Sequence, residues 1–133
     1  MASEQTVQEI EETFGQVPGF MQIMAEPASD HSWGIFRDLI LAETELSPRE
    51  KALVGVSAAA AMQCPYCAYF HKEEARFADV SEAGIEEAVN LAGSTRYFST
   101  LLHGNEYEHD DFVAETDDIF EHLREQEEAA ADD

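Results

Sequence analysis

Residues 46–76 read LSPREKALVGVSAAAAMQCPYCAYFHKEEAR, and this segment decides the fold because it predicts two successive helices. Its Ser-Pro-Arg-Glu start, residues 47–50, fits a capped helix, since the serine and the glutamate can cap reciprocally and the proline has no amide to leave unsatisfied. The stretch from residue 51 to about residue 62 is apolar on every side, so we expect this helix to be central. Pro65 suits the first position of the next helix, or a kink that continues the previous one.

Apolar residues spaced three and four apart predict further helices on both sides of this segment. The chain shows no apolar–polar alternation typical of strands, so the predicted class is all-α. We expect one helical domain over residues 1–133, in which the acidic tail, about residues 125–133, is frayed. The predicted helices are residues 7–14, ending near Gly15; a helix capped by Ser29 or Asp30 that runs to about Ala42; residues 82–92, capped by Ser81; residues 96–102; and a helix that starts at Asp110 or Asp111, with Phe112, Ile119, Phe120 and Leu123 inward.

The chain of 133 residues carries 29 Asp and Glu against 7 Lys and Arg, which gives a formal net charge of −22. Such a surface repels phosphate backbones and anionic lipids, so we expect neither nucleic-acid nor membrane partners. The composition resembles that of proteins from salt-accumulating microbes, in which molar salt screens the self-repulsion. The acidic start has no apolar signal-peptide core, so a cytoplasmic protein is predicted. The uncharged residues 52–70 contain Gln63 and Pro65, which favours a buried helix over a membrane span.

Two thiols and an imidazole follow the central helix, because Cys64, Cys67 and His71 form a Cys-x-x-Cys-x-x-x-His pattern. Cys64 falls at the N-cap of the second helix and Cys67 in its first turn, close enough for a disulfide. The partial positive charge of a helix N-terminus lowers the pKa of a thiol. His71 shares a face with Cys67 and can take or return a proton. The pattern favours peroxide reduction, in which a thiolate becomes a sulfenic acid that the second cysteine converts to a disulfide.

Residues 46–104 resemble the alkylhydroperoxidase D-like (AhpD-like) group of the carboxymuconolactone decarboxylase family. The likeness rests on the capped Ala-rich helix, the Cys-x-x-Cys-x-x-x-His pattern and the downstream runs SEAGIEEAVNLA and RYFSTLLHG. It implies an orthogonal helix bundle, thiol-dependent hydroperoxide reduction with an antioxidant role, a dithiol reductant, no cofactor, and assembly into trimers or hexamers. It assigns the peroxidatic role to Cys67, the resolving role to Cys64 and a proton-relay role to His71.

One position departs from the family pattern, because Ala52 stands where the family places a relay glutamate, twelve residues before the first cysteine. Glu50 lies on nearly the opposite face of a helix and is a more natural cap than an acid catalyst. Arg96 and His103 are conceivable substitutes for the missing carboxylate. The Tyr66 hydroxyl could line a substrate entrance.

Two alternatives to the peroxidase hypothesis stay open. The chain could be an oligomeric redox-sensing or metal-binding protein without turnover, in which Cys64, Cys67 and His71 supply three ligands, although no fourth is evident nearby. It could also be a decarboxylase of a small organic acid, for which the cysteine pair would be superfluous. The favoured hypothesis needs no metal. The apolar residues 20–24 and the face that bears Tyr97 and Phe98 would be covered most simply by another copy, which predicts a homo-oligomer.

Overall fold

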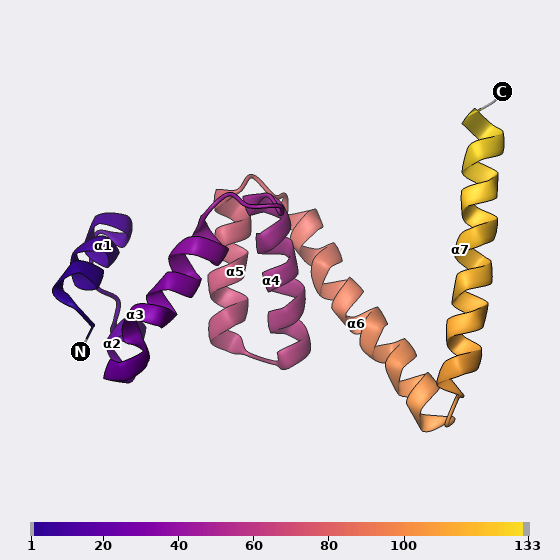
Figure 1. The fold of residues 1–133 in the computed structure, drawn as a ribbon, viewed down its shortest axis with the longest axis horizontal. Helices are drawn as coiled ribbons and strands as arrows, with labels where there is room; N and C mark the ends of the chain where they lie inside the picture. The colour runs from indigo at the N-terminus through magenta and orange to yellow at the C-terminus, as the bar shows by residue number, and fades with distance from the viewer. Residues whose placement is uncertain (1, 132–133) are drawn as a thin grey trace. The chain divides into compact units, whose positions relative to one another are not determined.

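The computed structural model describes residues 2–131 of the chain, and in this part every regular element is a helix. The all-α prediction is therefore confirmed. The chain divides into two compact units, an N-terminal unit that ends at Asn90 and a C-terminal unit that begins at Leu91. The elements, labelled as in Figure 1, are α1 (Glu4–Phe14), α2 (Gly19–Gln22), α3 (Glu26–Ile35), the π-helix η1 (Phe36–Leu41), α4 (Pro48–Met62), α5 (Pro65–Phe77), α6 (Glu82–Gly104) and α7 (His109–Ala131).

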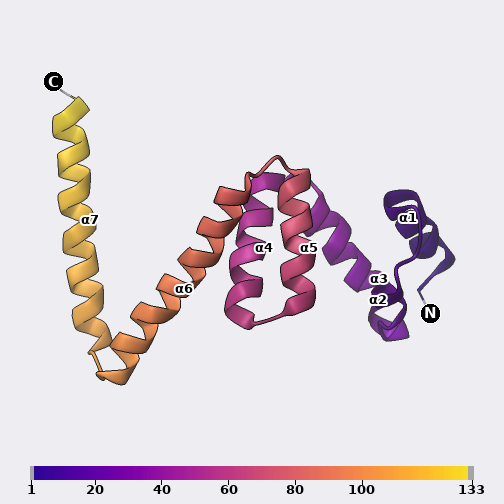
Figure 2. The ribbon, with the colours of Figure 1, turned by 180° about the vertical axis from the view of Figure 1, so that it is seen from behind.

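Helices α4 and α5 form a hairpin and lie side by side in both ribbon views (Figure 1 and Figure 2). The predicted capping box is confirmed: the Glu50 amide donates to the Ser47 hydroxyl at 3.2 Å, and the Ser47 amide donates to the Glu50 carboxylate at 2.6 Å. The helix ends at Gln63, which takes the left-handed conformation with φ 57°. Because only Gln63 and Cys64 separate the two helices, the chain reverses direction and α5 packs back along α4.

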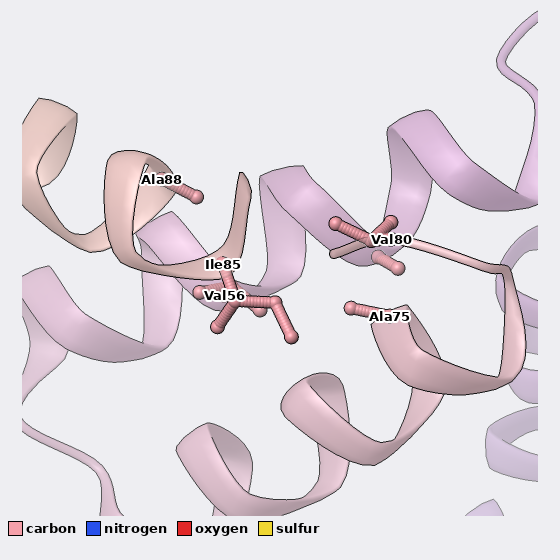
Figure 3. Close-up of a cluster of buried hydrophobic side chains, with 6 residues drawn as sticks. Val56, Ala75, Val80, Ile85 and Ala88 are labelled. Carbon is pink, nitrogen blue, oxygen red and sulfur yellow. The ribbon is translucent and has the colours of Figure 1, made fainter. Parts of the chain in front are cut away.

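A core of small apolar side chains joins α4, α5 and the first turns of α6 (Figure 3). Ala52 of α4 and Ala75 of α5 are completely buried, which lets the two helix backbones approach closely. The Ser57 hydroxyl adds a hydrogen bond to the Ala88 carbonyl of α6 at 2.7 Å. This packing fixes the α4–α5 hairpin, on which the predicted site residues lie. The cluster consists of Ala52, Val56, Ala75, Val80, Ile85 and Ala88.

A second cluster, mostly aromatic, packs the first helices together. Trp33 is almost completely buried, and its indole N–H donates to the Glu9 carboxylate at 2.9 Å. Phe36 stacks on Trp33 with ring centroids 6.3 Å apart and meets Phe70 of α5 edge-on at 5.6 Å. Phe36 therefore connects this cluster to the helix that carries the cysteines. The cluster is built from Ile10, Met21 and Trp33, with Phe14, Val17, Met24 and Phe36 packed against them.

The predicted cap at Ser29 or Asp30 is wrong, because α3 begins earlier, at Glu26. Pro27 occupies the first turn of this helix, where its missing amide and fixed φ cost nothing. The Ser29 hydroxyl instead donates to the Glu26 carbonyl at 3.0 Å, inside the helix. The Asp30 carboxylate accepts from the Ser3 amide at 2.9 Å and so connects α3 to the start of α1.

Helix α6 is continuous, although the sequence predicts two helices, residues 82–92 and 96–102, with Gly93 between them. The polar residues after this glycine do not interrupt the helix, because the hydroxyls of Ser94 and Thr95 both donate to the Leu91 carbonyl, at 3.0 and 2.9 Å. Such hydrogen bonds satisfy the hydroxyls within helical backbone geometry. The predicted cap is confirmed, since a first-turn amide donates to the Ser81 hydroxyl at 3.1 Å.

Helix α7 begins at His109, slightly before the predicted start, and runs to Ala131. Residues 125–131, for which the sequence predicts fraying, are helical, and the last two residues of the predicted tail lie outside the described part of the chain. The prediction that its apolar side chains face inward is wrong for the described chain, which buries no side chain of α7. The four residues concerned, Phe112, Ile119, Phe120 and Leu123, are between 43% and 56% exposed.

Candidate redox site

Cys64 is the N-cap of α5, as the position of Pro65 predicts. Its backbone is extended, and its sulfur accepts a hydrogen bond from the Cys67 amide at 3.2 Å. The sulfur therefore takes the place that a serine or aspartate oxygen fills in most helix caps. A thiolate is a better acceptor here than a thiol, because the amide and the helix dipole both favour negative charge.

The sulfurs of Cys64 and Cys67 lie 2.6 Å apart, and both cysteines are free. Hydrogen bonds from the Cys67 thiol and from the Cys67 amide lower the pKa of Cys64 below its ordinary value. The hydrogen bond to Cys64, together with burial, raises the pKa of Cys67. Of the two coupled thiols, Cys64 is therefore the one that ionises more readily.

His71 lies one turn beyond Cys67 on α5 and is held by a carboxylate. Its Nδ1 lies 2.7 Å from Oε2 of Glu74, which is three residues further along the helix. The side chains of His71 and Glu74 are only 24% and 17% exposed. This partly buried contact is stronger than an ion pair in open solvent, because less water competes for either partner.

The His71 ring also lies close to the backbone of α4 at Gly55. A Cβ atom at position 55 would overlap Nδ1 of the ring and would lie 2.5 Å from its Cγ and 2.7 Å from its Cε1. Real Cβ atoms do not approach other heavy atoms so closely, so only glycine leaves room for the ring. The imidazole is thus held between the α4 backbone and the Glu74 carboxylate.

Glu50 and Tyr66, considered as supporting residues, have other settings. The Glu50 carboxylate caps α4 at the end of that helix opposite Cys64. It accepts a hydrogen bond from the Ser47 amide, and this bond lowers the pKa of Glu50. Tyr66, which lies between the two cysteines in the sequence, is 86% exposed, so its side chain faces solvent. The hairpin therefore brings Cys64 into contact with Cys67 and places His71 on the same helix, and it leaves Glu50 elsewhere.

Arg96 and His103, the two other candidates for the missing carboxylate's role, belong to the C-terminal unit. Arg96 is exposed on α6. His103 lines a hollow of about 630 Å³ in that unit, together with Leu102, Gly104, Glu106, Tyr107, His109 and Phe112. Both residues are therefore described by their neighbours within the C-terminal unit, and these neighbours do not assign either residue a role at the cysteine pair.

Two residues of the site were missed by sequence reasoning. Glu74 had a usable signal, because a carboxylate three residues after a histidine on a helix lies next to it. The signal is hard to see in this sequence, since Glu73 stands beside Glu74 and either could be the partner. Gly55 had no local signal, because its contact with His71 exists only once the hairpin has formed.

Among residues 2–131, no group of three or more His, Cys, Asp and Glu side chains is arranged to hold a metal ion. The three donors considered for a metal have protein partners instead: Cys64 pairs with Cys67, and His71 with Glu74. In the same described range, no helix combines the length and the apolar character that crossing a membrane requires.

The chain is similar to known proteins at the level of family and fold. The model of the carboxymuconolactone decarboxylase family matches residues 27–107. The crystal structure of the alkylhydroperoxidase AhpD core from Rhodospirillum rubrum matches with a TM-score of 0.71 and 21% identity, over 84% of this chain and 85% of that chain. A crystal structure of a protein from Methanobacterium thermoautotrophicum matches with a TM-score of 0.55 and 30% identity, over 65% of this chain and 96% of that chain. No curated protein matches the chain. The first structure confirms the predicted AhpD-like helical fold.

Proposed function

The chain belongs to the carboxymuconolactone decarboxylase family, and from this premise we propose that it reduces hydroperoxides with electrons from a dithiol, in an antioxidant role. One observation carries the proposal: two free sulfurs lie 2.6 Å apart at the N-terminus of α5. At this distance the pair can close to a disulfide with little movement, and closing it releases the two electrons that peroxide reduction needs. Both cysteines are partly exposed, so a small reactant can reach them from solvent.

The first step takes place at Cys67. Its thiol gives a proton to His71, and the thiolate attacks the terminal oxygen of the hydroperoxide. The O–O bond breaks, Cys67 becomes a sulfenic acid, and the leaving alkoxide takes the proton back from His71 to become an alcohol. This step consumes one hydroperoxide and leaves the imidazole neutral again.

The second step closes the disulfide. The Cys64 thiolate attacks the sulfur of the Cys67 sulfenic acid, the S–O bond breaks, and the departing hydroxide takes up a proton to become water. An external dithiol then reduces the disulfide by exchange and is itself oxidised. Overall, one hydroperoxide and one dithiol become an alcohol, water and a disulfide.

The opposite pKa shifts of the two cysteines support this division of roles. Cys64, whose pKa is lowered by hydrogen bonds from the Cys67 thiol and amide, is the more readily ionised thiol of the pair, which suits a resolving cysteine. Cys67, whose pKa is raised, requires a base before it can attack. His71 lies on the same helix face, one turn away, and is the base that we propose.

The proposal is tested by peroxide consumption with a dithiol reductant, comparing the unaltered protein with Cys67→Ser and Cys64→Ser. We expect turnover by the unaltered protein and none by Cys67→Ser. Cys64→Ser should consume one equivalent of peroxide and give a sulfenic acid that dimedone traps. Equal rates for the unaltered protein and Cys67→Ser would refute the peroxidase proposal, and trapping in Cys67→Ser alone would reverse the two roles. A disulfide that forms once and resists dithiols would favour the redox-sensing alternative.

We also propose that the working form is a homo-oligomer, a trimer or a hexamer. The described chain exposes apolar side chains on several helices of both units, and exposed apolar surface is typical of protein–protein interfaces. Phe20, which the sequence assigns to a covered segment, is 52% exposed, and Tyr97 and Phe98 on α6 are 61% and 59% exposed. The apolar side chains of α7 are exposed as well, and a second copy of the chain would bury such side chains.

A further inference from the structure

Two adjacent glutamates follow His71, and the structure treats them differently. Glu73 is 53% exposed and pairs with Arg76 on the surface of α5. Glu74 is 17% exposed, and its Oε2 lies 2.7 Å from Nδ1 of His71. The partner of Glu74 is therefore the imidazole, at a partly buried position where one specific hydrogen bond matters more than it would in open solvent.

This contact fixes which ring nitrogen carries the proton. An ionised carboxylate has no proton to donate, so the contact is a hydrogen bond only when Nδ1 carries a hydrogen. A neutral imidazole has one N–H, and placing it on Nδ1 leaves Nε2 as the nitrogen with a free lone pair. Gly55 completes the arrangement, because the ring lies so close to the α4 backbone that it has little room to turn.

We propose that Glu74 is a positioning residue, which holds His71 with Nδ1 protonated so that Nε2 can take the proton of Cys67. Ala52, where the family pattern places a carboxylate, is completely buried in the core beside Ala75 and has no polar group to offer. The carboxylate comes from α5 instead, from the residue that precedes Ala75. Glu74 acts through His71 and does not touch the reacting sulfur. This inference rests on the proposed peroxidase function.

The matched variants are Glu74→Gln and Glu73→Gln, which each remove one negative charge from adjacent positions on α5. Peroxide consumption with a dithiol is measured for both variants and for the unaltered protein. We expect Glu74→Gln to lower the rate about 10-fold to 100-fold, as changes of a histidine's supporting carboxylate commonly do. Glu73→Gln should keep the rate of the unaltered protein, and Glu74→Asp should recover part of the loss by restoring the carboxylate.

A second measurement does not depend on turnover or on any variant. Long-range ¹H–¹⁵N NMR spectra of the unaltered protein report the His71 tautomer, with the resonance assigned by its loss in His71→Asn. We expect the Nδ1–H form in the unaltered protein and in Glu73→Gln, and a mixture of tautomers in Glu74→Gln. An Nε2–H form in the unaltered protein, or equal peroxidase rates for Glu74→Gln and Glu73→Gln, would overturn the inference. If no protein consumes peroxide but Glu74→Gln alone loses the Nδ1–H form, the positioning role stands and the peroxidase proposal fails.

Discussion

Replacing Gly55 with alanine should separate the stability of the α4–α5 hairpin from the chemistry of its site. The added Cβ would overlap the His71 ring, with its Cγ at 2.5 Å and its Cε1 at 2.7 Å. Contacts this short cannot persist, so the ring must turn out of its place or the two helices must move apart. If the ring turns out, Nδ1 leaves the Glu74 carboxylate, which now lies at 2.7 Å; if the two helices move apart, this contact within α5 persists.

The energies of the two responses differ. Alanine in place of glycine inside a helix stabilises it by about 1 kcal/mol, whereas overpacking a rigid site costs about 1–3 kcal/mol. If the ring stays, we expect Gly55→Ala to unfold more easily by up to about 2 kcal/mol, the difference between these two magnitudes. If the ring turns out, the helix keeps its gain and the protein becomes slightly more stable. Turning the ring out also removes the proposed base from Cys67, which should slow turnover by about 100-fold or more, whereas a ring that stays keeps the base in place.

Gly93→Ala is the matched control, because a Cβ at position 93 would meet nothing within 4 Å on α6. We expect this variant to gain about 0.5–1 kcal/mol in unfolding free energy and to keep full activity. The assays are urea unfolding followed by circular dichroism and peroxide consumption with a dithiol. If Gly55→Ala gained the same stability as Gly93→Ala and kept the activity of the unaltered protein, the His71 ring would not be packed against α4, and the site geometry would have to be abandoned.

Four further predictions concern the thiols, the helix cap, the charge and the apolar surface. The rate of Cys64 alkylation by iodoacetamide should reach half its maximum at a pH below the ordinary thiol pKa of about 8.5. Cys67→Ala should raise this midpoint pH, because it removes the thiol hydrogen bond that lowers the pKa of Cys64. An unchanged midpoint pH would contradict a hydrogen bond between the two thiols. Ser47→Ala should lower the unfolding free energy by about 1 kcal/mol in urea titrations through loss of the cap, with the exposed Ser99→Ala as the near-neutral control. The melting temperature should fall between molar and low-millimolar NaCl because a net charge of −22 then repels itself, and a salt-independent value would speak against halophilic adaptation. Light scattering should give the mass of an oligomer for the unaltered chain and a smaller mass for Ile119→Glu, whereas equal masses would exclude this face of α7 from the interface.

Local chemistry explains most of what the sequence predicted correctly. The capping box at Ser47 and the N-cap at Cys64 each depend on residues three positions apart, so they can be recognised without knowing the fold. The mistaken break at Gly93 is also local, but there the hydroxyls of Ser94 and Thr95 had two options. They could cap a new helix or bond back to a carbonyl of the existing one, and only the formed helix shows which option is taken.

The parts that sequence reasoning missed depend on tertiary structure. The fit of the His71 ring against Gly55 requires the reversal at Gln63 and the close approach that Ala52 and Ala75 allow. The exposed apolar side of α7 has a different cause. Periodicity identifies an apolar face correctly, but it does not say whether the same chain or another copy covers that face.

The arrangement around His71 favours catalytic turnover over a passive redox pair. A cysteine pair that only reports redox state needs one readily ionised thiol, and Cys64, whose pKa is lowered by the thiol and the amide of Cys67, already meets this need. Such a pair has no use for a base, because disulfide exchange starts from the thiolate itself. Cys67, whose pKa is raised, is the sulfur that needs a base, and one turn away a largely buried imidazole is in contact with Glu74 and packed against Gly55. The contact with Glu74 also leaves Nε2 free to accept a proton. The proposed proton transfer at Cys67 would use each of these features, and the proposed peroxide attack by Cys67 is the step that would require this transfer.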